Sequence, residues 1–305
     1  MSAPLFSIIV TTRNEEANLE ACLKSLRGQS YFNTEIIVVD NNSTDSTKGI
    51  ANRYTDLVFN LGPERSAQRN FGMLEVAKGK FVMYVDADMI LTPDLIKMAV
   101  HQLENSTIAA LYVPEVVLGK TLFARIRRFE RQFYDATVID AARIFRKDLL
   151  LLSGGFDEVL FERGSGEDWD LDKRIRQLGS VRMLQESSVI RSASEIEIIL
   201  KNQGVQIRAN WQGILHNESQ DRLIPYLKKK RYYSSGFSGY INKWGNQDSD
   251  IQRQFGIKYR LFQVFTENNK WKTSLRHPIK IAMVIALKIL VALSSMGKWR
   301  SEYKN

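Results

Sequence analysis

The stretch that decides the fold lies at residues 81–88 and reads Phe81-Val82-Met83-Tyr84-Val85-Asp86-Ala87-Asp88. An apolar run without polar alternation is typical of a strand buried on both faces, as in a parallel sheet. The two carboxylates that follow are one residue apart, so both can reach a single cation at the strand end. Mg²⁺ and Mn²⁺ prefer such oxygen ligands and usually share them with substrate phosphates. Because an Asp-x-Asp triplet also occurs by chance, its surroundings decide whether it is a site.

Three further apolar runs precede this strand, and helical patterns separate them. We predict strands at residues 6–11, 35–40 and 57–60 and helices at 15–27, 44–54 and 65–77. Downstream we predict strands at 108–113 and 142–145 and helices at 121–134 and 168–178. This alternation indicates an α/β fold, a Rossmann-like, doubly wound and mostly parallel sheet. In such sheets ligands bind beyond the carboxyl ends of the strands.

Polar residues follow each of the first four predicted strands. They lie at residues 11–15, 40–45, 62–66 and 86–88. Any one of these loops is ordinary, since Ser43 or Thr44 could simply cap the next helix. Four polar strand ends on one rim favour a ligand site over four unrelated loops.

Two later positions have both a structural and a chemical interpretation. In Gly166-Glu167-Asp168-Trp169, the acidic pair could cap a helix or meet its dipole. Alternatively, Asp168 is a general base that takes the proton from an attacking hydroxyl. His216 is either a structural histidine or a ligand that completes a carboxylate-bound metal site.

Taken together, the motifs resemble those of a family 2 glycosyltransferase. The resemblance rests on residues 7–16, 38–45, 86–88, 154–157 (Gly-Gly-Phe-Asp) and 166–171, in that order. It covers residues 5–218 and implies the GT-A fold. It also implies metal-dependent, inverting transfer of a sugar from a nucleotide-diphosphate sugar to a hydroxyl acceptor. The expected setting is polysaccharide, cell-envelope or glycolipid synthesis.

The resemblance also implies roles by position. The nucleotide-sugar site would consist of Thr11, Arg13, Glu15, Asp40, Ser43, Arg65, Arg69, Asp86 and Ala87. Within it, Asp40 would bind the base, usually uracil. Asp88 and His216 would hold Mn²⁺ or Mg²⁺, and Asp168 would be the catalytic base. Glu167 and Trp169 would lie on the acceptor side.

Some positions depart from the family pattern. Thr12-Arg13 and Asn41-Asn42 are unusual pairs, so the nucleotide stays open, with UDP favoured. The chain has no Gln-x-x-Arg-Trp motif of processive polysaccharide synthases, which favours the addition of a single sugar.

The chain of 305 residues carries its positive charge at one end. Residues 221–305 hold 17 Lys and Arg against 5 Asp and Glu, leaving 26 against 29 for the rest. We therefore divide the chain into a catalytic domain at 1–218 and a basic helical tail at 219–305. In the tail, residues 279–296 are apolar except for one polar stripe that includes Lys280 and Lys288. This pattern favours a helix in the plane of a membrane surface, or one packed on protein, over a spanning helix.

These features predict a cytoplasmic protein at the inner face of the plasma membrane. Cys22 is the only cysteine and the first residues are no leader, which favours an intracellular compartment. A membrane position would suit a lipid-linked acceptor. We expect no nucleic-acid partner, because the main domain lacks a recognised binding motif.

Two other classes of protein stay open at this point. One is an enzyme that uses Asp86 and Asp88 differently, a nucleotidyltransferase or an acid-phosphatase-like hydrolase. The other is a non-catalytic, membrane-associated binding protein on the same fold. Against the first class, the chain has no glycine-rich phosphate signature near its first predicted strand. Against the second, the chain has all the candidate acids, which a non-catalytic protein would not need.

Overall fold

A computed structural model describes all residues except 1–2, 105–106, 162–164, 187–193, 235 and 303–305, and it describes no side chains at 194–195 and 296–302. Its centre is a seven-stranded sheet in the order β3-β2-β1-β4-β8-β6-β9. The strands are β1 (Phe6–Thr12), β2 (Thr34–Asp40), β3 (Val58–Asn60), β4 (Phe81–Asp86), β6 (Ile108–Tyr112), β8 (Ile144–Arg146) and β9 (Ser180–Met183). Strand β8 runs antiparallel to both neighbours, and the other pairs are parallel. This confirms the predicted α/β, mostly parallel sheet.

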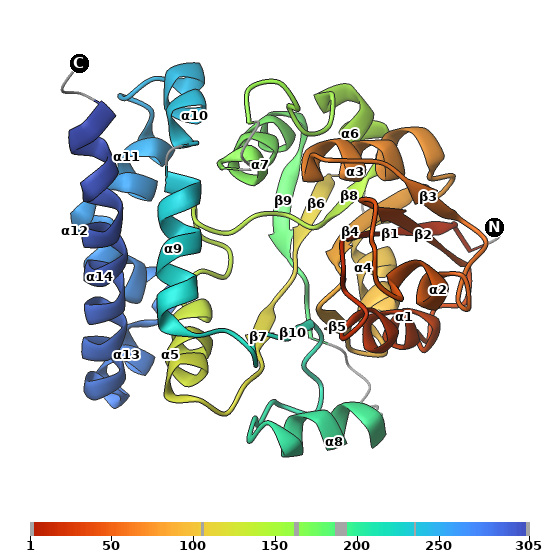
Figure 1. Ribbon diagram of the computed structural model, residues 1–305, viewed down its shortest axis with the longest axis horizontal. Coiled ribbons are helices and arrows are strands. Elements are labelled where there is room, and N and C mark those ends of the chain that lie inside the picture. Colours follow the sequence, from red (N-terminus) through yellow and green to blue (C-terminus); the bar gives the residue numbers. More distant parts are fainter. Residues whose placement is uncertain (1–2, 105–106, 162–164, 187–193, 235, 303–305) are drawn as a thin grey trace.

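Helices cover both faces of this sheet, as Figure 1 shows. One core packs the sheet against α1 (Leu19–Arg27), α2 (Thr47–Ala51) and α4 (Leu95–Leu103). The other packs it against the π-helix η1 (Phe71–Val76), α6 (Lys147–Ser153) and α7 (Glu167–Leu178). The buried β4 residues Val82 and Tyr84 face the second core, and Met83 and Val85 face the first. The apolar run at 81–85 is therefore buried on both faces, as its composition predicts.

A second, three-stranded sheet extends the rim of the first. It consists of β5 (Met89–Leu91), β7 (Glu115–Val117) and β10 (Ile214–His216), with β10 in the middle. Residue His216 pairs with Met89 and with Val117. Because Met89 follows Asp88 directly, this sheet brings His216 beside the acidic triplet across 128 positions of sequence.

The remaining elements are helical. Helix α3 (Arg65–Asn70) contacts β1 and β2, α5 (Leu122–Arg131) contacts β7, and α8 (Ser194–Asn202) packs on the three-stranded sheet. The tail forms α9 (Leu223–Ser234), α10 (Phe237–Trp244), α11 (Ser249–Phe255), α12 (Ile257–Leu261), η2 (Gln263–Phe265), η3 (Glu267–Asn269), α13 (Trp271–Arg276) and α14 (Pro278–Glu302). In Figure 1 α14 lies along the edge of the molecule away from the sheets, and it contacts α9 and α5. The domain boundary at residue 218 stays a prediction.

The first two helices are shorter than predicted, because the residues before them have turn rather than helical conformations. Residue Asn14 has φ of 52° and the α1 helix begins only at Leu19. Helix α2 spans five residues rather than the eleven predicted. The predicted helix at 65–77 is present but changes from α3 to the π-helix η1 at Phe71.

Candidate active site

Strand register places the predicted carboxylates along one rim. Within the sheet, Thr12 of β1 pairs with Asp40 of β2, and Thr11 pairs with Asp86 of β4. The ends of β2 and β4 therefore flank the end of β1, as parallel pairing requires. Asp86 and Ala87 lie on this rim, with Ala87 buried.

The first two loops are tied together by backbone donors and side-chain acceptors. The amide of Asn14 donates to Ser43 Oγ at 2.8 Å, and the amide of Glu15 donates to Thr47 Oγ1 at 2.8 Å. In return, Asn14 Oδ1 accepts from the Thr44 amide at 2.9 Å. These bonds hold the loop that carries Arg13, whose side chain is exposed, over the rim.

Asp40 is enclosed at the end of β2. It accepts from the amide and the hydroxyl of Ser43, the amide at 2.8 Å, and Lys48 Nζ lies 3.6 Å away. Its side chain is 1% exposed. The contact of Asp40 with a nucleotide base stays a prediction, and such a contact would require Ser43 to move.

Arg69 joins two of the predicted site carboxylates, Asp86 and Asp168. It is 2% exposed, and its Nη2 donates to Asp86 Oδ1 and its Nη1 to Asp168 Oδ1, each at 3.1 Å. Its guanidinium lies 4.2 Å from the Tyr84 ring centre, a cation–π contact. The Tyr84 hydroxyl also donates to Asp168 Oδ1 at 3.0 Å. Residues that are 99 and 17 positions from Arg69 therefore share one buried cation.

The charges around Asp86 favour its ionised form. Desolvation acts against ionisation, but Arg69, Arg143 and Arg65 outweigh it and hold the pKa of Asp86 below its usual range. Glu15 responds in the opposite direction, because desolvation and then the negative charges of Asp88 and Asp86 raise its pKa. Asp88 and Asp86 thus act on Glu15 as neighbouring negative charges.

The two predicted acceptor-side residues differ in accessibility. Glu167 is buried and pairs with Arg65 at 2.8 Å, and desolvation followed by the charge of Asp168 raises its pKa. Trp169 lies on a cavity wall, donates from Nε1 to Ile139 O at 3.0 Å and stacks on Phe237. Gly166, before this helix, has φ of 92°, a conformation that favours glycine.

A divalent cation fits at Asp88 and His216. The Oδ1 atom of Asp88 is buried without a hydrogen-bond partner among the described residues, and Oδ2 lies 3.2 Å from His216 Nε2. Glu115 Oε1 lies 2.7 Å from His216 Nδ1, so a carboxylate orients the imidazole, as is usual for a metal-binding histidine. The described residues contain no cluster of three acidic, His or Cys side chains able to hold a metal. Substrate phosphate and water would therefore complete the coordination, as is common for Mg²⁺.

Three residues of this site, Tyr84, Glu115 and Arg143, are absent from the sequence-based set. Arg143 Nη2 donates to Glu115 Oε2 at 3.4 Å, and Nη1 lies 3.9 Å from Asp86. For Tyr84 a signal was present, because strand alternation places residues 84 and 86 on one face. Glu115 and Arg143 lie on short strands or beside them, and no spacing in the sequence links them to Asp88.

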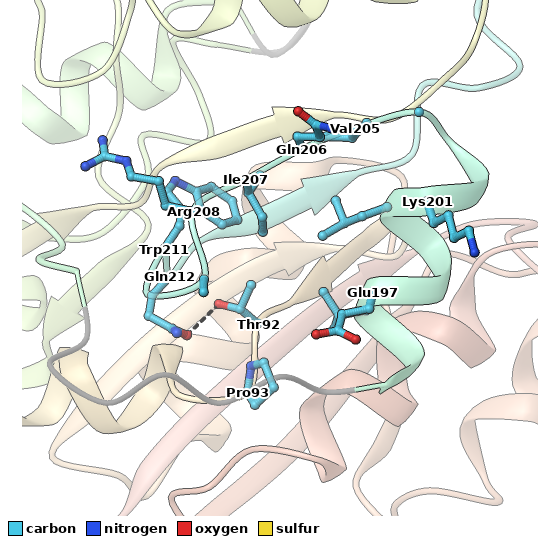
Figure 2. Close-up of a pocket in the computed structure, with 14 residues that line it drawn as sticks. Thr92, Pro93, Glu197, Lys201, Val205, Gln206, Ile207, Arg208, Trp211 and Gln212 are labelled. Carbon is cyan, nitrogen blue, oxygen red and sulfur yellow. Dashed lines mark hydrogen bonds between the residues drawn. The ribbon is translucent and has the colours of Figure 1, made fainter.

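The rim opens into a cavity of about 1100 Å³. Its wall includes Tyr84, Asp168, Trp169 and His216 and continues onto the tail helices α9 to α12 and α14. A second pocket of about 810 Å³ lies between α8 and the segment at 204–212 (Figure 2), where Thr92 bonds to Gln212 at 2.7 Å. None of the predicted catalytic or metal-binding residues lines this second pocket.

In sequence, part of the chain is similar to glycosyltransferases. The family model described as Glycosyl transferase family 2 matches residues 7–153. An uncharacterized glycosyltransferase of Haemophilus influenzae is 38% identical over 103 residues, which cover 31% of this chain and 40% of that protein. The PGL/p-HBAD biosynthesis glycosyltransferase of Mycobacterium bovis BCG is 28% identical over 190 residues, 57% of this chain and 70% of that protein. The chain thus spans less than half of the Haemophilus relative.

The fold also has a solved counterpart. A mannosyltransferase from Pyrobaculum calidifontis, solved with GDP-Man and Mn²⁺, has a TM-score of 0.55 at 20% identity. The likeness covers 99% of this chain and 82% of that one, and at this identity it concerns the fold alone. Residues 7–153 thus match glycosyl transferase family 2, and the architecture is that of the GT-A fold.

Proposed function

We propose that this protein moves one sugar from a nucleotide-diphosphate sugar to a hydroxyl acceptor with inversion at the anomeric carbon. The acceptor oxygen attacks that carbon, the bond to the diphosphate breaks, and Asp168 takes the hydroxyl proton. The products are the glycosylated acceptor and a nucleoside diphosphate. We place the reaction in polysaccharide, cell-envelope or glycolipid synthesis.

The observation that carries this proposal is the shared guanidinium of Arg69. It fixes the base candidate Asp168 and the donor-side Asp86 on two nitrogens of one planar group. A base must lie within reach of the acceptor and close to the donor carbon, because geometry limits proton transfer before pKa does. The Tyr84 hydroxyl adds a second bond to Asp168 and restricts its orientation.

Asp88 and His216 would hold Mn²⁺ or Mg²⁺ against the donor. The bound cation would neutralise negative charge on the departing diphosphate. Glu115 would keep the His216 ring in position from the other side. The Pyrobaculum structure, which contains GDP-Man and Mn²⁺, supports a nucleotide sugar and a divalent cation in this class of protein.

Nucleoside diphosphate binding should therefore depend on the cation. We expect calorimetry to show that UDP, or failing that GDP, binds at least about tenfold more tightly with Mn²⁺ than with a chelator. Asp88→Asn should remove that difference. Glu115→Gln should weaken the affinity for Mn²⁺ by roughly 10–100-fold, as for other residues that orient a metal ligand. Asp148→Asn, an exposed change on α6, is the control. Equal binding with chelator and with Mn²⁺ would refute the metal site.

We also propose that the tail lies on the cytoplasmic face of the plasma membrane. Lys288 of α14 faces the protein, where it donates to Arg260 O at 2.7 Å. The opposite side of α14 is apolar and open to solvent, at Ile279, Met283, Leu290 and Leu293. The 18-residue window 278–295 has the length and composition of a membrane helix, but only 11% of it is buried. The anionic inner leaflet would also attract the basic tail.

Flotation of the full-length protein with anionic vesicles tests this position. Ile279→Glu with Leu290→Glu should weaken binding by at least about tenfold, since each apolar side chain contributes up to about 1.5–3 kcal/mol when buried. Ile198→Glu on α8, at an exposed position outside the tail, should leave binding unchanged. A lipid-free dimer that the double change dissociates would instead make this face a protein interface.

A further inference from the structure

The cavity beside Asp168 is amphiphilic. One part of its wall belongs to the candidate active site, with Tyr84, Asp168 and His216. Another part is apolar and comes from the tail, with Phe237, Ile257, Leu261, Leu287 and Leu293. A polar sugar alone would not need the second part, because most of that wall offers no hydrogen bonds.

A band of charged residues connects the active site to the cavity. Glu218 Oε1 lies 3.9 Å from His216 Nδ1 and 3.3 Å from Arg127 Nη2. The Arg127 guanidinium lies 4.9 Å from the Tyr226 ring, and Lys230 Nζ lies 5.4 Å from the same ring on its own helix α9. A series of side-chain contacts thus runs from His216 through Glu218, Arg127 and Tyr226 to Lys230.

The same band reaches α14 from the other side. Lys288 Nζ lies 5.1 Å from the Tyr134 ring, and the Tyr134 hydroxyl donates to Glu130, which pairs with Arg127 at 2.5 Å. Lys288 also donates to the backbone carbonyl of Arg260, whose side chain is a further cation on the cavity wall. The charged band thus lies between the catalytic centre and the apolar helix.

The cations in this band outnumber the carboxylates available to them. Glu115, Glu130, Asp140, Asp168 and Glu218 each have an arginine partner. Among the described residues, no carboxylate lies within 4.0 Å of the side-chain nitrogens of Lys230 or Arg260. Partial removal from water, followed by the charge of Arg127, lowers the pKa of Lys230 to about 8. A bound anion would offset this excess of positive charge.

We propose that this cavity binds a phosphate-bearing amphiphile, the chemical class of the sugar acceptor. Its hydroxyl-bearing head would reach Asp168, its phosphate would meet Lys230 and Arg260, and its apolar chain would follow the wall formed by Leu287 and Leu293. This inference rests on the proposed function and adds the acceptor class to it. It also explains why the apolar wall is continuous with the exposed face of α14, from which a lipid chain could enter.

Calorimetry of the full-length protein in neutral detergent tests the cavity directly, with dodecyl phosphate as the probe. Dodecanol has the same chain without the charge, and inorganic phosphate has the charge without the chain. We expect dodecyl phosphate to bind at least about tenfold more tightly than either. Lys230→Ala and Arg260→Ala should each weaken it by about tenfold, the size of a lost charge-assisted hydrogen bond.

The matched controls are Lys229→Ala and Lys258→Ala. These lysines lie on the same two helices, are exposed and do not line the cavity. If the control variants lost as much affinity for dodecyl phosphate as the test variants, general surface charge would explain the effect and the proposal would be wrong. If dodecanol bound as tightly as dodecyl phosphate, the cavity would have no anion site. If inorganic phosphate bound as tightly, the apolar wall would not bind a lipid chain.

A separate measurement of nucleotide binding tests the proposed function. Binding of UDP or GDP with Mn²⁺ to the same Lys230 and Arg260 variants should be unchanged, and this binding also shows that they fold. If dodecyl phosphate binds as expected while no nucleoside diphosphate binds, the proposed transfer fails and the amphiphile site stands. If nucleotide binding is intact and dodecyl phosphate does not bind, the acceptor class is wrong and the transfer stands.

Discussion

Replacement of Asp168 by Asn is expected to lower the rate of sugar transfer by roughly 10²–10⁴, the usual contribution of a general base. The amide keeps the shape of the side chain and can still accept from Arg69 and Tyr84, whose bonds both end on Oδ1. It cannot take a proton from the acceptor hydroxyl. Affinity for the nucleoside diphosphate with Mn²⁺ should stay within about twofold of the unmodified protein.

This combination separates a base from a structural acid. Transfer is measured as nucleoside diphosphate released in the presence of acceptor, and binding by calorimetry on the same preparation. Asp148→Asn, which removes a carboxylate that forms an exposed local pair with Arg146, controls for the loss of one acid. Unimpaired transfer by Asp168→Asn would show that another group takes the proton.

Replacement of Arg69 by Met is expected to lower both stability and transfer. The methionine keeps an apolar stem against Tyr84 and Phe156, over whose rings the guanidinium lies. Asp86 and Asp168 lose their shared cation, and removal of one partner from a buried pair costs about 3–5 kcal/mol. Because the two aspartates are 29% and 35% exposed, we expect a loss of unfolding free energy near 3 kcal/mol.

Urea unfolding measures that loss, with Arg53→Met as the control. Arg53 forms an exposed pair with Glu20, and such pairs contribute about 0–1 kcal/mol. Arg69→Lys keeps the charge but not the planar fork, so it should recover part of the stability while transfer stays low. If Arg69→Met were as stable and as active as the control, the guanidinium would have no role in holding the two acids.

Much of the fold was predictable because its strands are buried on both faces. The runs at 6–11, 35–40 and 81–85 have no polar alternation, and β1, β2 and β4 are indeed neighbours in the centre of the sheet. The polar ends of these strands meet by parallel register, so the grouping of Asp40 and Asp86 on one rim follows from the same pattern.

The remaining parts of the site depend on long-range contacts that no local sequence pattern predicts. Strands β5, β7 and β10 have three residues each, too few for a periodic signal. They nevertheless align Asp88, Glu115 and His216, residues separated by up to 128 positions. In the same way, the stripe of α14 that includes Lys288 was visible in the sequence, whereas its direction, toward the protein, depends on Tyr134, Phe265 and the carbonyl of Arg260.

The identity of the nucleotide product tests the proposed reaction most directly. The full-length protein is incubated with a panel of UDP- and GDP-linked sugars and Mn²⁺, and the released products are separated and identified. Sugar transfer predicts release of the nucleoside diphosphate from one donor, and none when a chelator replaces Mn²⁺. Release of pyrophosphate, or of a nucleoside diphosphate at the same rate from Asp168→Asn with acceptor present, would contradict an inverting glycosyl transfer at this site.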